Sequence, residues 1–133
     1  MIELRPAAWS DDIAALLAAA ESGASLADLR GQIEAGAASL FEVVRQGDGA
    51  RLAAYVLRVD RGVCGDEGVV LSAGGRADFD LFATCMPAIE AQFSNVVAIR
   101  MHTARAGLLK KAAALGYRPV EIVLKKQVNH EQQ

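Results

Sequence analysis

Cysteine, histidine and aromatic residues are all scarce in this chain. It has two cysteines, Cys64 and Cys85, and two histidines among 133 residues, which makes neither a disulfide framework nor a spaced set of metal ligands. We therefore expect two free thiols, as in a protein of a reducing compartment, and no metal site. Aromatic residues make up 5% of the chain, so the expected core consists of Ala, Val, Leu and Ile.

The chain also lacks an excess of one charge sign and a long apolar run. Its 14 Lys and Arg against 16 Asp and Glu give a net charge of −2, which argues against the broad basic surface that nucleic-acid-binding proteins usually need. No apolar run reaches the roughly 18 residues that a membrane span requires. The first residues, Met1–Pro6, do not resemble a secretory leader. We expect a cytoplasmic protein with no nucleic-acid or membrane partner.

The apolar content is sufficient for one packed domain. Hydrophobic residues make up 53% and charged residues 23% of the chain, a balance typical of globular domains rather than disordered chains. We expect a single domain over residues 1–128 and a frayed polar tail at 129–133. Periodicity predicts strands at 2–5, 39–46, 51–60, 67–73, 96–102 and 117–128, and helices at 11–22, 26–35, 78–94 and 105–115.

Capping and stop residues delimit the first two predicted helices. Ser10 and Ser25 each precede an apolar stripe at helical spacing, and we interpret them as N-caps. Gly23 and Gly36 are the predicted ends of these helices. The third predicted helix contains Pro87, which is expected to kink or divide it because proline lacks a backbone N–H.

The stretch Leu71–Phe79 predicts a strand that runs into two glycines and then into a helix. Gly74 and Gly75 allow a sharp turn, and the N–H groups at a helix start can bind an anion such as a phosphate. The planar guanidinium of Arg76 suits the same anion. Two alternatives stay open, because the glycines can equally form a plain turn and Arg76 can pair with a nearby aspartate.

The predicted order of elements resembles that of the GNAT superfamily, the GCN5-related N-acetyltransferases. The segment Leu108–Tyr117, which ends in Leu-Gly-Tyr, is similar to the family's last helix and its closing motif. Together with Ala73–Arg76 and Ile89–Ala91, it is also similar to small GNAT-like proteins of bacteriophages and prophages. The resemblance implies an α/β (α+β) fold with a mixed, mostly antiparallel central sheet flanked by helices.

In this family acyl-CoA lies where the fourth strand splays from the fifth, and its pyrophosphate binds backbone N–H groups at the start of the next helix. The resemblance therefore implies acetyl-CoA as the cofactor, with N–H groups near Leu71 and Ala73 polarising the thioester carbonyl. The cofactor-binding residues that it implies are Leu71, Ala73, Gly74, Gly75, Arg76, Ala77 and Arg105.

Two residues, Glu67 and His102, are candidates for the base that takes a proton from an amine. Family members often carry a glutamate on the strand of Glu67, and a histidine titrates near neutral pH. The alternative for each is a solvated residue at a strand end. The family's proton-donating tyrosine falls on Ala112 in this chain, and Tyr117 is interpreted as a core aromatic.

The resemblance favours a divergent acyl-CoA-dependent N-acyltransferase whose amine or protein acceptor is unidentified. The alternative is a catalytically inactive GNAT-fold module, phage-associated, that binds another protein. A homodimer would form if an edge strand or the final strand paired between two copies.

Overall fold

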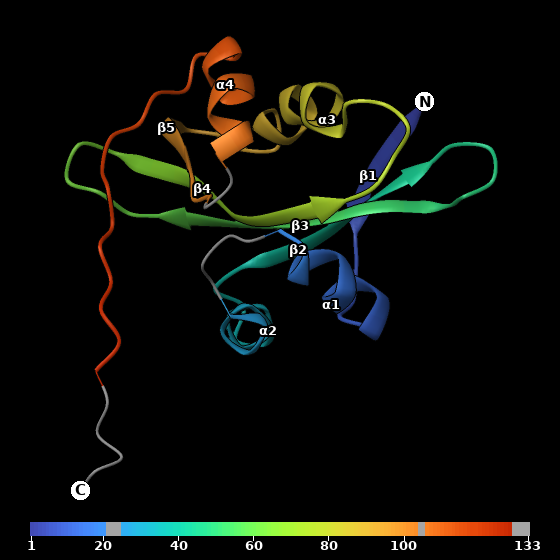
Figure 1. The fold of residues 1–133 in the computed structure, drawn as a ribbon, viewed down its shortest axis with the longest axis horizontal. Helices are drawn as coiled ribbons and strands as arrows, with labels where there is room; N and C mark the ends of the chain where they lie inside the picture. Colours follow the sequence, from blue (N-terminus) through green and yellow to red (C-terminus); the bar gives the residue numbers. More distant parts are fainter. Residues whose placement is uncertain (21–24, 104–105, 129–133) are drawn as a thin grey trace, which may run out of the picture.

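The computed structural model describes residues 1–20, 25–103 and 106–128, which form a five-stranded sheet with helices on both faces (Figure 1). The elements are β1 (Ile2–Pro6), α1 (Asp11–Ala18), α2 (Leu26–Glu34), β2 (Ser39–Arg45), β3 (Arg51–Asp60), β4 (Asp66–Gly75), α3 (Leu81–Glu90), β5 (Val96–Met101) and α4 (Ala106–Ala114). The expected α/β fold with a mixed sheet and flanking helices is confirmed.

The strands lie side by side in chain order, β1-β2-β3-β4-β5. The first three neighbouring pairs are antiparallel, and only β4 and β5 run parallel. Helices α1 and α2 cover one face of the sheet, and α3 and α4 cover the other (Figure 1). Helix α3 forms the crossover between the two parallel strands, which cannot be joined by a tight hairpin.

Local signals in the sequence set the starts of the first two helices. The side chains of Ser10 and Ser25 each accept a hydrogen bond from the backbone N–H three residues further on, at 3.2 and 3.0 Å, which confirms both predicted N-caps. Gly36 follows α2 with φ of 78°, the left-handed conformation that commonly ends a helix. The predicted stop at Gly23 lies outside the described residues.

Alternation along β3 divides the core into two layers. Ala54 and Val56 pack with residues of α1 and α2, and both are 0% exposed. Ala53 and Tyr55 point to the opposite face and pack with residues of α3. The prediction that this strand is central and buried on both faces is confirmed, because residues 52–57 are all buried.

The predicted boundary between β4 and α3 is wrong. The strand continues through Gly75 instead of turning at the two glycines, and the helix begins at Leu81 rather than Asp78. The reason lies in the cap: the Asp80 side chain accepts a hydrogen bond from a helix N–H at 3.1 Å, so Asp80 becomes the first capping residue. The residues between Gly75 and Asp80 form a loop.

The end of α3 also differs from the prediction. The helix stops at Glu90 rather than Ser94, and it continues through Pro87 without being divided. The chain then turns into β5 through Asn95, which has φ of 58°, a conformation that asparagine adopts more readily than most residues. Beyond Glu90, apolar spacing therefore overstated the helix length.

The predicted last strand at 117–128 does not form. Residues 115–128 pair with none of the described strands and run on from α4 as an extended segment (Figure 1). Val120, Ile122 and Leu124 are 70%, 86% and 90% exposed. The alternation that predicted a strand is present in the chain, but a strand needs a neighbouring strand for its backbone hydrogen bonds. Residues 129–133 lie outside the described part.

Candidate functional site

The candidate site lies where β5 stops and β4 continues. The last residues in register between these parallel strands are Val70 and Met101, and Met101 is also the end of β5. Strand β4 runs on to Gly75, which still pairs with Ala53 of β3. Over its last five residues, β4 therefore has a strand neighbour on one edge only within the described chain.

A cavity of about 520 Å³ opens at this point. Strand β4, helices α3 and α4, and the residues that follow β5 line it. Tyr55, Met86 and Ile89 give it an apolar, buried wall. Ala20 and Ala54, which lie on the α1 side of the sheet, also line it, so the cavity reaches past the end of β4 to both faces.

Charged and titratable side chains surround the exposed part of the cavity. Arg76, Asp80, His102 and Lys111 all line it and are all exposed. Lys111 of α4 lies 3.5 Å from the Asp80 carboxylate. The backbone N–H of Ala83 donates to the same carboxylate and, with Lys111, holds the pKa of Asp80 below its usual range. At neutral pH this rim carries two cationic side chains and one anionic side chain, apart from the histidine.

Ser72 is a buried polar residue in the wall of the cavity. It pairs with Val56 across a bulge in β4, on the face of the sheet that α1 and α2 cover, and is 2% exposed. Ser72 is among the lining residues, and its Oγ has no hydrogen-bond partner among the described residues. A buried hydroxyl without a partner costs about 1–3 kcal/mol of desolvation.

The Tyr55 hydroxyl and the Cys85 thiol, which also belong to this wall, have contacts within the protein that explain them. The hydroxyl of Tyr55 donates to Gln92 Oε1 at 2.6 Å, and burial raises the pKa of Tyr55 above its usual value. Cys85 is 5% exposed and packs in the α3 layer, and burial raises the pKa of its thiol. Cys85 is therefore a packing residue, and neither group is set up as an ionised nucleophile.

Five of the seven residues expected to bind the cofactor line the cavity, namely Ala73, Gly74, Gly75, Arg76 and Ala77. The side chain of Leu71 lies instead in the core layer under α1 and α2. Arg105 falls outside the described residues. Leu71 is the extra residue of a bulge in β4, because Val70 pairs with Leu57 and Ser72 pairs with Val56.

Gly74 and Gly75 do not form the sharp turn that was expected to bind a phosphate. Gly74 and Gly75 are strand residues paired with β3. The backbone N–H of Arg76 donates to the carbonyl of Leu52 at 2.9 Å, so it is already satisfied. Asp80 occupies the capping position of α3. The positive charge of this rim is carried by the Arg76 and Lys111 side chains.

The two candidate bases lie in different places. His102 follows β5 directly and lines the cavity. Glu67 does not line it, because it lies near the start of β4, where it pairs with Asp60 at the end of β3. Arg100 of β5 donates to Glu67 Oε1 at 2.9 Å, so the glutamate is held in an ion pair on the α2 side of the sheet.

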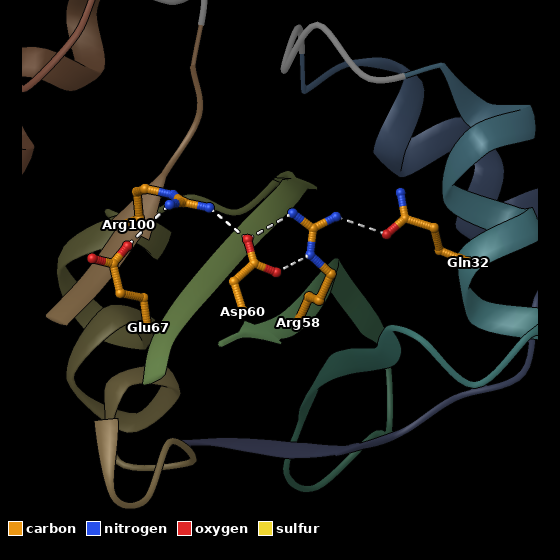
Figure 2. Close-up of polar contacts among 5 residues, drawn as sticks. All are labelled: Gln32, Arg58, Asp60, Glu67 and Arg100. Carbon is orange, nitrogen blue, oxygen red and sulfur yellow. Dashed lines mark hydrogen bonds and ion pairs between the residues drawn. The ribbon is translucent and has the colours of Figure 1, made fainter. Parts of the chain in front are cut away.

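Figure 2 shows that this ion pair is one end of a longer chain of contacts. Arg100 also donates to Asp60 Oδ2 at 2.6 Å. The guanidinium of Arg58 donates to both oxygens of Asp60, at 2.6 and 3.0 Å, and reaches Gln32 of α2 at 2.9 Å. Two carboxylates and two guanidiniums thus balance one another and tie the ends of β3, β4 and β5 to α2.

Two predictions concern positions near α4, namely Tyr117 as a core aromatic and Ala112 in place of the family's proton-donating tyrosine. Tyr117 is half-buried against the α3 layer and its hydroxyl donates to Glu90, so the core interpretation is confirmed. Burial and the nearby Glu90 carboxylate raise the pKa of Tyr117. Ala112 is 8% exposed and has no proton to give. The position that matches the family's proton-donating tyrosine therefore has no side chain that can donate a proton.

Sequence reasoning missed Ser72 and Tyr55 as lining residues. Ser72 had a usable signal, since it is a polar residue at an inward position of an otherwise apolar strand. The described residues contain no group of three or more His, Cys, Asp or Glu placed to hold a metal ion. None of the described helices is long and apolar enough to cross a membrane.

No protein-family model and no curated protein sequence matches this chain, but solved structures match its fold. A GCN5-related N-acetyltransferase of Ralstonia eutropha JMP134 superposes with a TM-score of 0.65 at 17% identity over 96% of this chain and 99% of its own. A possible acetyltransferase of Clostridium difficile 630 gives 0.68 at 14% identity over 97% and 99%.

Glucosamine-6-phosphate N-acetyltransferase of Arabidopsis thaliana gives a TM-score of 0.63 at 12% identity, covering 97% of this chain and 99% of its own. These matches span nearly the whole of each chain, so the likeness is of a complete domain rather than of a shared motif. At this level of identity the likeness concerns the fold alone. The chain therefore has the fold of the GNAT acetyltransferases.

Proposed function

We propose that this protein is an acyl-CoA-dependent N-acyltransferase whose donor site is the cavity between β4, β5 and α3. The observation that carries the proposal is the end of β5 beside a continuing β4, which opens a ligand-sized cavity in a fold shared with acetyltransferases. A volume of about 520 Å³ falls within the range of about 300–1,000 Å³ typical of small-molecule sites.

The residues present fit an acyl-CoA molecule. Its pantetheine arm is largely apolar, which suits the buried apolar wall of Tyr55, Met86 and Ile89. Its phosphates are anionic, and Arg76 and Lys111 provide positive charge at the exposed rim. Asp80 opposes this attraction, but Lys111 at 3.5 Å reduces its effect.

The bound acyl-CoA would supply an activated acyl group that an amine takes over, with release of the thiol. The protein's own contribution at this step is to hold the donor and to accept the amine proton. His102 is placed for the second task, because it lines the cavity and a histidine can take up a proton near neutral pH. Glu67 is held by Arg100 on the other side of β4.

Because Ala112 cannot donate a proton, we expect an effect on the turnover rate and not on the binding of acetyl-CoA. The departing thiolate would have to take its proton from solvent or from a rim residue. We therefore expect slow turnover with general amines even where acetyl-CoA binds well. Binding without any turnover would favour the alternative of an inactive module that retains the donor site.

The test is a thermal-unfolding and calorimetric titration with acetyl-CoA. A ligand that binds only the folded state raises the melting temperature, by roughly 5 °C at a concentration 10–100 times Kd. No shift and no heat at millimolar acetyl-CoA would contradict the proposal. Thiol release with a polyamine and with a peptide amine would then measure turnover.

A matched pair of lysines on α4 locates the site. Lys111 lines the cavity, whereas its neighbour Lys110 is exposed and does not. Lys111→Gln should weaken acetyl-CoA binding about 3- to 10-fold through loss of one cation near the phosphates, and Lys110→Gln should leave it unchanged. Equal effects of the two substitutions would show that the charge acts generally and not at this cavity.

A further inference from the structure

The extended segment that follows α4 carries large apolar side chains that nothing in the described structure covers. They are between 62% and 90% exposed and comprise Val120, Ile122, Val123, Leu124 and Val128. The backbone of the same residues pairs with none of the described strands. Clustered exposed apolar surface of this kind marks an interaction site in soluble proteins. The segment therefore has the composition of a strand that lacks a neighbour.

The sheet has an open edge that can take one more strand. Within the described residues, β5 pairs with β4 and with no other strand. Val97 of β5 is 64% exposed. An unpaired edge strand presents a row of N–H and C=O groups to an extended chain, and proteins usually cover such an edge. The outer edge of β5 thus lacks what the segment can supply.

The two faces of β5 differ in polarity, which limits the kind of strand that fits beside it. Ile99 and Met101 pack with the α3 layer. Arg100 lies between them in sequence and bonds to Asp60 and Glu67 on the α2 side of the sheet (Figure 2). A strand that extends the sheet beyond β5 must therefore carry apolar side chains on its α3 face and charged ones on its α2 face.

The segment has the two faces that this position requires. Val120, Ile122 and Leu124 share one face of the extended chain, because alternate residues point the same way. The other face carries Glu121 and Lys125 with a valine between them. Placed beside β5, the first face would continue the apolar row under α3 and α4, and the second would continue the row of ion pairs on the α2 side.

The other open edge of the sheet is less suitable. Strand β1 has five residues and ends at Pro6, which has no backbone N–H to donate. The segment also begins on the β5 side of the molecule. The Tyr117 hydroxyl donates to Glu90, the last residue of α3, and α3 leads directly into β5.

Within one copy, the segment and the edge of β5 stay apart. The segment leaves α4, passes the sheet and continues beyond it on the side of α1 and α2 (Figure 1). Each copy of the chain therefore has one unpaired segment and one unpaired edge. Two copies related by a two-fold axis can satisfy both at once, and such an exchange closes without leaving a further edge for growth.

We propose that two copies of this chain form a dimer by exchange, in which residues 120–128 of each copy pair as an added strand with β5 of the other. The proposal does not depend on the proposed function. Each added contact is limited by the six residues of β5, which places the exchange among the small, weak interfaces. In dilute solution the copies are separate, and the segment then adds little to the stability of the fold.

The molar mass of the full chain in solution tests the exchange. Sedimentation equilibrium from about 1 to 500 µM should show a monomer that passes into a dimer. Ile122→Asp puts a charge into the apolar face and should raise the dissociation constant at least about 10-fold. Gln127→Asp puts the same charge on the other face of the segment and should change it less than about 2-fold.

Two results of this experiment would overturn the proposal. A monomer at every concentration would do so, whether the segment is then free or packed on its own sheet. Equal effects of the two substitutions would also do so, because the face of the segment would then not matter. Both substituted residues are exposed in the separate chain, so both variants should fold, and circular dichroism checks this.

A mixing experiment distinguishes exchange from any other dimer. Val97→Asp damages the receiving edge and leaves the segment intact, whereas Ile122→Asp damages the segment and leaves the edge intact. Each variant alone should be monomeric where the wild type is a dimer. Their equimolar mixture should form a heterodimer, because it contains one intact pair of segment and edge. No association on mixing, or a single variant that still dimerises like the wild type, would overturn the proposal.

Discussion

Gly74 of β4 packs directly against the backbone carbonyl of Leu16 in α1. A Cβ atom added to Gly74 would lie 2.1 Å from that oxygen, a separation that backbone atoms cannot relieve without moving the helix. The glycine therefore permits the close approach of α1 to the end of β4. This contact, and not a turn, is the structural use of the first glycine of the pair.

Gly74→Ala should destabilise the fold. The added methyl group must displace α1 or bend β4, and overpacking of this kind costs about 1–3 kcal/mol. The control is Gly31→Ala inside α2, where a Cβ would meet nothing within 4 Å. That substitution should stabilise the protein by about 0.5–1 kcal/mol, since alanine is the better helix former. Urea unfolding of the two variants measures both changes, and a neutral Gly74→Ala would refute the close approach.

The extended segment after α4 should contribute little to stability. Leu124 is 90% exposed and Leu29 of α2 is 1% exposed, so the same change to alanine compares a surface with a core position. Leu29→Ala should cost about 2–5 kcal/mol, whereas Leu124→Ala should stay within about 0.5 kcal/mol of the wild type. Chemical denaturation provides both values. A large cost at Leu124 would mean that the segment is packed in solution, on its own sheet or on a second copy.

The ion-pair chain in Figure 2 should make folding sensitive to acid. Hydrogen bonds from Arg58, and then from Arg100, hold the pKa of Asp60 below its ordinary value of 3.8. A carboxyl whose folded pKa is lowered stabilises the fold above its unfolded pKa, and that contribution is lost as pH falls through the folded pKa. Stability should therefore decline from about pH 5 downward through pH 3.8 and below.

Asp60→Asn tests this origin of the acid sensitivity. The variant should be less stable than the wild type at pH 7, and the difference should shrink as pH falls, because protonation removes the same charge from the wild type. Glu34→Gln is the control, since Glu34 forms an exposed pair with Arg30 on one helix and such pairs are worth about 0.3–0.5 kcal/mol. A constant difference between wild type and Asp60→Asn from pH 7 to pH 3 would contradict the assignment.

The two candidate bases can be separated by substitution. If His102 accepts the amine proton, His102→Gln should lower kcat/KM about 100-fold. Glu67→Gln should leave kcat/KM nearly unchanged, since Arg100 holds Glu67 outside the cavity. The measurement is thiol release with one amine. A large loss in Glu67→Gln, with His102→Gln unaffected, would reverse the two roles.

Much of the fold was predictable because its signals are local. Ser10 and Ser25 cap helices through contacts only three residues long, so their role is visible in the sequence. The unbroken apolar run at residues 52–57 likewise indicated a central strand, and all of these residues are buried. The extended segment at 117–128 shows the limit of this reasoning, because alternation predicts the tendency to form a strand but not the neighbour that the strand requires.

The site was predictable in part. The stretch from Ala73 to Ala77 and His102 were expected in the candidate site, and all of them line the cavity. Glu67 and Leu71 were placed in that region as well, but Glu67 does not line the cavity and the Leu71 side chain packs in the core under α1 and α2. Alternation along the strand could not have placed these residues, because β4 carries a bulge between Val70 and Ser72 that changes which residues share a face.

The sequence by itself determined the first nine elements, their order and the Ser10 and Ser25 caps, because these depend on side-chain spacing and on hydrogen bonds between near neighbours. Only the tertiary structure decided that Gly74 and Gly75 are packing positions within a strand, that residues 117–128 form no strand, and that β5 ends at Met101 while β4 continues. The same non-local contacts left the Ser72 hydroxyl buried without a partner among the described residues. The cavity exists because β5 ends while its neighbour β4 continues, so the two strands are paired over only part of their length. Where each strand ends is a property of the assembled sheet.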